Sequence, residues 1–216
     1  MLLSEVDSKR MLLEAGINAT ATELARTKDE AVAISERLGY PVVLKIVSSD
    51  VAHKSDAGGV KLKLQTQGEV AEAYDAILES IRAKYPQAGI QGMSVQKMAR
   101  PGLEVIIGMY EDKQFGPVLM FGLGGVWVEL MKDVSFKLTP MTRQDASDMI
   151  KEIKGYALLK GFRGSEPADT SYLEEMILKV AQLVEQKPQI KELDLNPVFA
   201  YRDGAIAVDA RIIVAD

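Results

Sequence analysis

The chain has 216 residues, of which 47% are hydrophobic and 26% charged, a composition typical of a globular protein with a substantial core. Its formal net charge of -5 disfavours nucleic acid as the main ligand. The absence of cysteine and the presence of one histidine exclude disulfides, thiolate catalysis and metal sites built from several Cys or His ligands. A bound metal would need oxygen ligands, which points to magnesium or calcium.

The sequence predicts neither a transmembrane helix nor a signal peptide. No run of about 18 apolar residues is present. The first residues include Glu5 and Asp7 and lack a cleavable apolar segment. We therefore expect a cytoplasmic protein with no membrane partner.

Predicted helices and strands alternate along the chain. Capping boxes that begin at Thr27, Thr66 and Ser171 predict the starts of three helices. Short links between several strands favour an α+β fold with mainly antiparallel sheets. The turn at 86–89 predicts a boundary between subdomains 1–88 and 89–216. The predicted strands are 42–47, 60–64, 92–98, 103–109, 118–121, 134–138, 193–201 and 205–213.

Lys45 is the first candidate functional residue, because it lies in the middle of an apolar, β-branched strand. A buried ammonium group must pair with an anion or lose its charge. Two interpretations are open. Lys45 either lies on an edge strand with its head in solvent, or it meets a phosphate in a cleft.

The segment that follows contains His53, the single histidine, and the adjacent pair Gly58 and Gly59. Adjacent glycines let backbone N–H groups approach an oxyanion, and Lys54 and Ser55 can add donors. The segment is neither a P-loop nor a GxGxxG motif. A lone histidine is most often structural or merely exposed. On a polar, glycine-rich loop, however, it suits a nucleophilic imidazole that accepts a phosphoryl group.

The C-terminal region predicts a polar hairpin around a turn at Asp203 and Gly204. With that turn, Asn196 would oppose Arg211, and Asn196 and Asp209 would be diagonal neighbours about 7–8 Å apart. Two oxygen donors at that spacing can converge on nucleotide-bound magnesium, although a solvent-facing polar stripe is an equally good interpretation. One face would carry Asp194, Asn196, Asp209 and Arg211.

A glycine-rich stretch at 122–125 precedes Trp127. These glycines either relieve crowding in a strand–turn–strand unit or present backbone to a ligand or partner. The pattern leaves both interpretations open.

Taken together, these features resemble the ATP-grasp subunit of ADP-forming acyl-CoA synthetases, relatives of succinyl-CoA synthetase, over nearly the whole chain. The most specific match is the segment His-Lys-Ser-Asp-Ala-Gly-Gly-Val at 53–60, because ATP-grasp proteins in general lack that histidine loop. The other matching stretches are 39–45, 121–125 and 192–198.

The resemblance implies an ATP-grasp fold, in which two α+β subdomains hold ATP or ADP between their sheets. Lys45 would contact a nucleotide phosphate, and Gly58 and Gly59 would lie over the phosphates. Glu104 would bind the ribose. The hinge that reads adenine would consist of Gln96, Lys97 and Met98.

The same resemblance assigns the remaining site residues. Asn196 and Asp209 would hold Mg²⁺, and Asp194 would orient the histidine or a metal-bound water. His53 matches the second relay histidine of the family, which receives the phosphoryl group from a histidine on the CoA-binding subunit. Lysine, backbone donors and magnesium would stabilise the transferring phosphoryl group.

The implied reaction converts acyl-CoA, ADP and phosphate to the acid, CoA and ATP, reversibly, with acetyl-CoA as the expected acyl-CoA. No residues remain for a CoA-binding domain, so the chain would need a CoA-binding alpha subunit, in an α2β2 heterotetramer. The turns at 122–125 and 161–164 are candidates for that contact.

Two other functions remain open. One is a stand-alone ATP-grasp ligase that joins a carboxylate to an amine and has no phosphohistidine. The other is a non-catalytic ATP-binding domain of a larger fused synthetase or acyltransferase. The joint presence of Lys45, His53, Asn196 and Asp209 disfavours a degenerate domain. The sequence leaves the acyl substrate and the choice between ATP and GTP undetermined.

Overall fold

The structure is a computed structural model that describes residues 1–51, 54–125 and 133–215. The chain divides into two compact units. The N-terminal unit comprises Ser4–Lys9 and Thr20–Ala99, and the C-terminal unit comprises Met1–Leu3, Arg10–Ala19 and Arg100–Asp216. Helix α1 (Glu5–Glu14) contributes its first residues to the former and its last residues to the latter. Among the described residues, no helix is long and apolar enough to cross a membrane.

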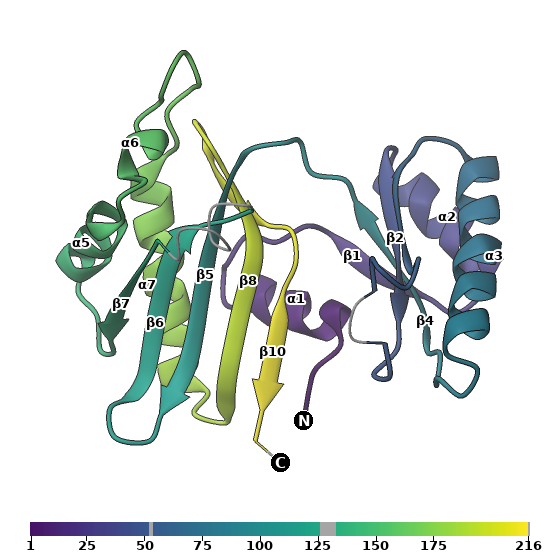
Figure 1. The fold of residues 1–216 in the computed structure, drawn as a ribbon, viewed down its shortest axis with the longest axis horizontal. Helices are drawn as coiled ribbons and strands as arrows, with labels where there is room; N and C mark the ends of the chain where they lie inside the picture. Colours follow the sequence, from purple (N-terminus) through teal and green to yellow (C-terminus); the bar gives the residue numbers. More distant parts are fainter. Residues whose placement is uncertain (52–53, 126–132, 216) are drawn as a thin grey trace. The chain divides into compact units, whose positions relative to one another are not determined.

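The N-terminal unit is a four-stranded antiparallel sheet with two helices on one face (Figure 1). The strand order is β1-β4-β2-β3. Side chains that alternate along β2 and β4 pack against the helices, because a strand presents every second residue to the same face. The elements are β1 (Thr22–Ala25), α2 (Lys28–Leu38), β2 (Val42–Val47), β3 (Val60–Leu64), α3 (Gln67–Lys84) and β4 (Gly92–Lys97).

Both helices of this unit begin where the capping boxes predict. The Thr27 hydroxyl accepts the Glu30 N–H at the start of α2, and the Thr66 hydroxyl accepts the Glu69 N–H at the start of α3. These bonds satisfy N–H groups that have no partner within the helix. The two predicted starts are confirmed.

The C-terminal unit is a six-stranded antiparallel sheet of order β10-β8-β5-β6-β7, with β9 also paired to β8. Helices α5 and α7 pack on one face, where the larger hydrophobic core lies. The elements are β5 (Leu103–Asp112), β6 (Gly116–Leu123), β7 (Val134–Leu138), α5 (Arg143–Glu152), α6 (Tyr156–Leu159), α7 (Thr170–Gln186), β8 (Ile190–Tyr201), β9 (Gly204–Ala207) and β10 (Arg211–Val214).

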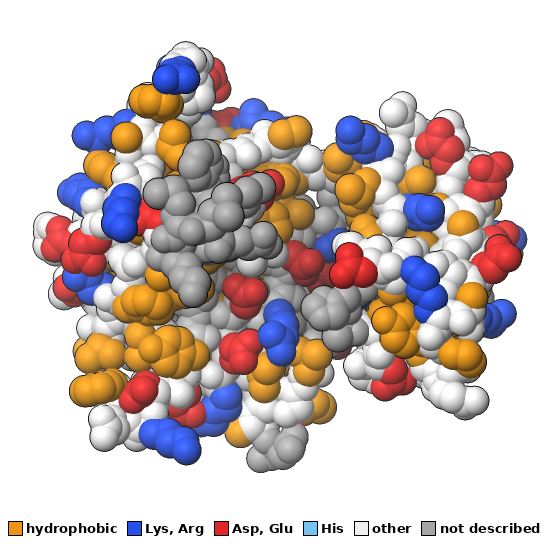
Figure 2. All heavy atoms as spheres, viewed as in Figure 1, with side chains coloured by type: hydrophobic (Ala, Val, Ile, Leu, Met, Phe, Trp, Pro, Cys, Tyr) orange, Lys and Arg blue, Asp and Glu red, His pale blue; other side chains and the backbone are white. Residues whose placement is uncertain are grey.

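The other face of this sheet is not covered by α5 or α7 and is seen in Figure 2. The register of β5, β6 and β7 aligns Tyr110 with Val118 and Leu138, and Met120 with Phe136. Tyr110 and Phe136 form an edge-to-face pair with ring centroids 6.5 Å apart. Figure 2 shows hydrophobic side chains exposed over β6 and β7.

The α+β class with antiparallel sheets is confirmed, and three details of the sequence-based assignment change. The turn at 86–89 precedes β4, but β4 pairs with β1 and β2, so the N-terminal unit continues to Ala99 rather than ending at residue 88. The third predicted helix begins at Thr170, and its cap is Asp169 rather than Ser171. The last predicted strand is interrupted at 208–210, which divides it into β9 and β10.

Candidate functional site

Lys45 lies on an interior strand of the N-terminal sheet. Of its two interpretations, the one that places it on an edge strand is therefore wrong. Strand β2 is bordered by β3 and β4, and every residue of β2 is buried. The ammonium group pairs with an anion, as a buried charge requires: its Nζ donates to Glu5 Oε1 at 2.7 Å. Glu5 is in the first turn of α1, forty positions earlier in the chain.

A second lysine shares the same carboxylate. Lys9 Nζ donates to Glu5 Oε1 at 2.9 Å, one helical turn along α1. Three other oxygens lie within hydrogen-bond distance of the same Nζ and share its N–H groups: the Gln96 side-chain oxygen at 2.6 Å and the hydroxyls of Thr20 and Thr22 at 2.8 and 3.2 Å. These bonds attach the start of α1 to β1 and β4 of the sheet.

Glu5 is ionised in this cluster despite its burial. Its side chain is 2% exposed, and Lys54 Nζ lies 3.9 Å from its second oxygen, Oε2. Burial by itself raises the pKa of a carboxyl group, but the nearby Lys45 and Lys9 ammonium groups outweigh that effect and lower the pKa of Glu5 to about 2. Glu5 therefore stays ionised at any physiological pH.

The glycine pair has a packing role in the structure. The Gly58 and Gly59 N–H groups donate to the Ser55 and Lys54 carbonyl oxygens at 3.0 and 2.7 Å. A Cβ atom at Gly59 would lie 2.6 Å from Ile46 Cγ2, which is too close for any side chain. Gly58 has φ +76°, the left-handed region that favours glycine. Both N–H groups thus bond to carbonyl oxygens of the same loop. The expected contact of these glycines with phosphate stays a prediction.

The residues expected at the adenine hinge lie at the end of β4. Gln96 is buried, and its side-chain oxygen accepts from Lys9, as described above. Lys97 Nζ donates to the carbonyl oxygens of Gly39 and Tyr40 at 2.8 and 2.7 Å. The Met98 N–H donates to the Pro41 carbonyl at 3.1 Å. The structure gives these residues contacts within the N-terminal unit, and adenine recognition stays a prediction.

In the C-terminal unit, Glu104 on β5 lies against the end of the glycine-rich stretch. The Gly124 N–H donates to the Glu104 carbonyl oxygen at 2.7 Å. A Cβ atom at Gly125 would lie 2.8 Å from Glu104 Oε2. Relief of crowding holds at Gly124, where a Cβ atom would lie 3.0 Å from Glu104 Cβ. At Gly125 the reason for glycine is its φ of +62°, in the left-handed region.

The hairpin register differs from the expected one by two residues. Tyr201 pairs with Gly204 and Val198 with Ala207, so the two-residue turn comes one position earlier than predicted. Strand β10 pairs Arg211 with Asp194. A shift of two residues keeps Asp194, Asn196 and Arg211 on their predicted face, because side chains alternate with a period of two. Beyond them, an extra residue of β8 between Leu195 and Val198 reverses the alternation, so that Val198 is buried.

Asn196 and Asp209 become opposite rather than diagonal positions as a result. Between the pairs Val198–Ala207 and Asp194–Arg211, three residues remain on each side, with Asn196 and Asp209 at the two centres. The Val208 N–H donates to the Pro197 carbonyl at 2.9 Å across this interruption. The structure therefore retains the face predicted for metal binding and corrects its geometry.

Asp194 is partly buried on this face. Burial and the charge of Glu192 raise its pKa, and Asp209 acts in the same direction against the lowering effect of Arg211. A carboxyl group under such opposed influences is common at functional sites. The expected catalytic role of Asp194 stays a prediction that this environment supports.

The oxygen donors of this face fit magnesium rather than a fully protein-bound metal. Among residues 1–51, 54–125 and 133–215, no three His, Cys, Asp or Glu side chains gather closely enough to hold an ion by themselves. Mg²⁺ usually keeps several waters and takes one or two protein ligands in addition to substrate phosphates. Asn196 and Asp209 match that smaller requirement.

Two predicted features lie outside the described residues. His53, the expected phosphoryl carrier, is one, and Trp127 of the glycine-rich stretch is the other. Asp133, where the description resumes, accepts N–H bonds from Lys154 and Gly155 at 2.8 and 2.7 Å. That carboxylate orders the turn before α6.

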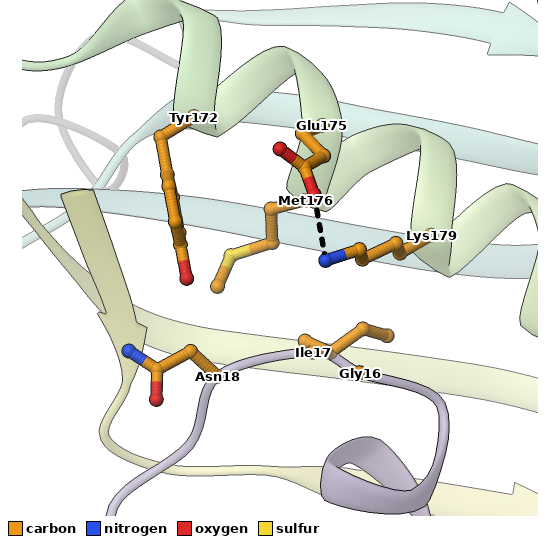
Figure 3. Close-up of a pocket in the computed structure, with 7 residues that line it drawn as sticks. All are labelled: Gly16, Ile17, Asn18, Tyr172, Glu175, Met176 and Lys179. Carbon is orange, nitrogen blue, oxygen red and sulfur yellow. Dashed lines mark ion pairs between the residues drawn. The ribbon is translucent and has the colours of Figure 1, made fainter.

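A shallow pocket in the C-terminal unit contains none of the predicted site residues (Figure 3). Its empty space of about 160 Å³ includes open solvent, so it is a surface depression and not an enclosed cavity. Glu175 and Lys179 form an ion pair at its rim. The lining residues are Gly16, Ile17, Asn18, Tyr172, Glu175, Met176 and Lys179.

Sequence reasoning missed Glu5 and Lys9 as part of the lysine site. An acid in the first turn of a helix and a lysine four positions later are the usual pattern of a solvated helix start, so the local signal pointed elsewhere. The hint that existed was Lys45 itself, whose burial required an anion from some distant part of the chain.

Comparison with known proteins gives matches along the whole chain. Residues 1–214 match the family model described as an ATP-grasp domain. The beta subunit of acetate–CoA ligase [ADP-forming] I of Pyrococcus furiosus is 48% identical over 98% of this chain and 91% of its own length. Acetate–CoA ligase [ADP-forming] I of Archaeoglobus fulgidus is 46% identical over 95% of this chain, which spans 30% of that longer protein.

Solved structures agree with these matches. The dinucleotide forming acetyl-coenzyme A synthetase 1 of Ca. Korarchaeum cryptofilum, in complex with coenzyme A, Ca-AMPCP and HgCl⁺, aligns with a TM-score of 0.96 and 48% identity over 99% of this chain and 93% of that chain. The same protein with coenzyme A and Mg-AMPPCP, its phosphohistidine segment pointing towards the nucleotide binding site, aligns with a TM-score of 0.88 and 47% identity, again over 99% and 93%.

Proposed function

Because the chain belongs to the ATP-grasp family, and within it to the beta subunits of ADP-forming acetyl-CoA synthetases, we propose that it is the nucleotide-binding part of such an enzyme. The reaction is the reversible conversion of an acyl-CoA, expected to be acetyl-CoA, with ADP and phosphate to the acid, CoA and ATP. The observation that carries the proposal is the match to the Pyrococcus furiosus beta subunit over nearly the full length of both chains.

The chain contains candidate residues for each function that phosphoryl transfer needs. Lys45, held as a charged ammonium by Glu5, binds a nucleotide phosphate. Asn196 and Asp209 would hold Mg²⁺, which would offset the charge of the phosphate oxygens. Asp194 lies beside them on the same sheet face and orients the groups around the transferred phosphoryl. Electrostatic stabilisation and positioning account for most of catalysis in this class of reaction.

His53 carries the phosphoryl group. Phosphate first displaces CoA from the acyl-CoA to give an acyl phosphate, whose phosphoryl passes to a histidine of the CoA-binding part and releases the acid. It then passes to His53 and finally to the terminal oxygen of ADP. At each transfer one bond to phosphorus breaks as the next forms, so the sum is acyl-CoA, ADP and phosphate to acid, CoA and ATP. Lys54 follows His53 directly and is near enough to Glu5 to be anchored beside it.

A CoA-binding partner completes the enzyme. The beta subunit of Pyrococcus furiosus is named as one of separate subunits, whereas the Archaeoglobus fulgidus relative is a longer single protein. The partner is therefore an alpha subunit or a covalently linked CoA-binding region. We expect an α2β2 assembly where the two are separate chains.

Transfer of ³²P from γ-labelled ATP tests the proposal directly. With Mg–ATP and the CoA-binding subunit, the chain should acquire a label that is lost in acid and kept in base, as for phosphohistidine. His53→Ala should abolish both the label and ATP synthesis from acetyl-CoA. Ser49→Ala, which changes an exposed hydroxyl of the same segment, is the matched control and should retain both.

Asp209→Ala tests the metal assignment separately. The variant should bind Mg–ATP at least ~10-fold more weakly while its far-UV circular dichroism stays unchanged, since about 1.4 kcal/mol of lost binding free energy is a factor of ten. A His53→Ala protein with full ATP synthesis would refute the relay. Normal Mg–ATP affinity in Asp209→Ala would remove the hairpin from the site.

A further inference from the structure

We propose that Glu5 is a positioning residue of the nucleotide site, which fixes the Lys45 ammonium group and keeps it protonated while Lys9 fixes Glu5. The inference rests on the proposed role of Lys45 as a phosphate ligand and assigns two further residues to that site. Neither Glu5 nor Lys9 needs to touch the nucleotide for this role.

The geometry makes Glu5 the common point of the cluster. A single oxygen, Oε1, accepts from Lys9 Nζ at 2.9 Å and from Lys45 Nζ at 2.7 Å. Movement of this carboxylate would break both bonds together. An ammonium group has three N–H donors, so the bond from Lys45 to Glu5 is compatible with a further bond to a phosphate oxygen.

Lys9 fixes the carboxylate in turn. Its Nζ donates to Gln96 on β4 and to Thr22 on β1, and its side chain is 2% exposed. The first turn of α1 is thereby attached to the sheet on the face opposite to α2 and α3, because Gln96 and Lys45 lie on that face of β4 and β2. Few alternative positions are open to a side chain held by so many bonds.

The charges explain why a carboxylate is needed at residue 5. Because Lys9 and Lys45 bond to the same oxygen, their nitrogens lie within the sum of those two distances. Lys54 Nζ is a third ammonium group 3.9 Å from Oε2. Without the negative charge of Glu5, Lys9 and Lys45 would lose the carboxylate that they share, and burial and mutual repulsion would both favour loss of a proton. A neutral Lys45 would bind phosphate poorly.

The test is the pH dependence of Mg–ATP affinity, measured by calorimetry between pH 7.5 and 9.5, above the range in which the phosphates of ATP titrate. Wild-type affinity should stay constant within about 2-fold. In Glu5→Gln, which keeps the shape and removes the charge, affinity should fall on the order of 10-fold across this range as an ammonium group deprotonates. Glu175→Gln, at an exposed pair with Lys179 of the same i, i+4 spacing, is the matched control and should follow the wild type.

Glu5→Asp separates position from charge. It keeps the carboxylate but shortens the side chain by one methylene, so it cannot hold both bonds at their present lengths. Its Mg–ATP affinity should be lower on the order of 10-fold and independent of pH, so the conservative variant should restore the flat profile of the wild type. Where Glu5→Gln does not fold, this variant decides the matter, since wild-type affinity in Glu5→Asp would overturn the positioning role.

Nuclear magnetic resonance of ¹³C-lysine-labelled protein gives a readout without nucleotide. The Lys45 signal should show no titration up to pH 9.5 in the wild type, and Lys9 or Lys45 should titrate within this range in Glu5→Gln. A Glu5→Gln protein with reduced but pH-independent affinity would overturn the proposal and leave Glu5 a merely structural residue. If the wild type fails to bind Mg–ATP while the lysine signals of both proteins behave as expected, the proposed function is refuted and the role of Glu5 in the lysine cluster is not.

Discussion

The Glu5 carboxylate should make the stability of the N-terminal unit sensitive to acid. Its pKa is about 2 in the folded protein and 4.5 without the fold, because Lys45 and Lys9 outweigh the effect of burial. A depressed folded pKa contributes stability that is fully present above the unfolded pKa and is lost as the pH falls towards the folded value. The window here runs from about pH 5 to about pH 2. The shift corresponds to about 3 kcal/mol, of which about 2 kcal/mol is lost by pH 3.

Glu5→Gln isolates this contribution from those of the other carboxylates. Removing one partner of a buried ion pair costs about 3–5 kcal/mol, so the variant should be less stable by that amount at pH 7. The difference from the wild type should shrink by about 2 kcal/mol on going to pH 3, since protonated glutamate then resembles glutamine. Urea unfolding followed by circular dichroism gives the free energies, and hydrogen exchange of peptides from β2 assigns them to the N-terminal unit.

The control is Glu175→Gln, which removes the carboxylate of an exposed i, i+4 ion pair. Solvent screening should keep the difference in unfolding free energy between this variant and the wild type small at every pH. If the curves of free energy against pH for wild type and Glu5→Gln run parallel between pH 6 and pH 3, Glu5 is not ionised with a depressed pKa, and the charge argument is wrong.

Further substitutions test local packing and capping, each by its free energy of unfolding in urea. Gly59→Ala should destabilise by about 1–3 kcal/mol, because its Cβ would press on Ile46, whereas Gly68→Ala, within α3 and with no atom closer than 4.0 Å, should stabilise by about 0.5–1 kcal/mol. Asp133→Ala should cost about 1–3 kcal/mol, because it leaves the N–H groups of Lys154 and Gly155 without their acceptor. Equal unfolding free energies of Gly59→Ala and Gly68→Ala would contradict the proposed packing role of Gly59.

Local patterns predicted the elements well where one period dominated. The alternation and β-branching of 42–47 and 134–138 gave strands with the observed limits, and two capping boxes gave the starts of α2 and α3. These signals act within one helix turn or one strand and need no partner. A turn signal is different. The turn at 86–89 marks a change of direction but does not say that β4 returns to the same sheet, so the expected boundary was misplaced.

The site was predictable in its residue types and less so in its geometry. The hairpin face was identified because an even shift in register preserves it, but the interruption at 208–210 has no strong sequence signal. The charge of Lys45 could be expected to have a partner, yet nothing local identifies Glu5, forty positions away. Long-range charge pairing depends on how the start of α1 lies on the sheet, which periodicity does not encode.

The two candidate site regions treat buried charge in opposite ways. In the N-terminal unit, Glu5 is surrounded by ammonium groups and has a depressed pKa, so its charge is fixed. In the C-terminal unit, burial, Glu192 and Asp209 raise the pKa of Asp194 and outweigh the lowering effect of Arg211, so its charge is only partly compensated. A carboxylate whose negative charge is more than balanced by neighbouring ammonium groups holds those groups in place. A carboxylate whose charge is only partly balanced attracts a further cation. The proposed function uses both properties, with lysine for the phosphates and oxygen donors for the metal.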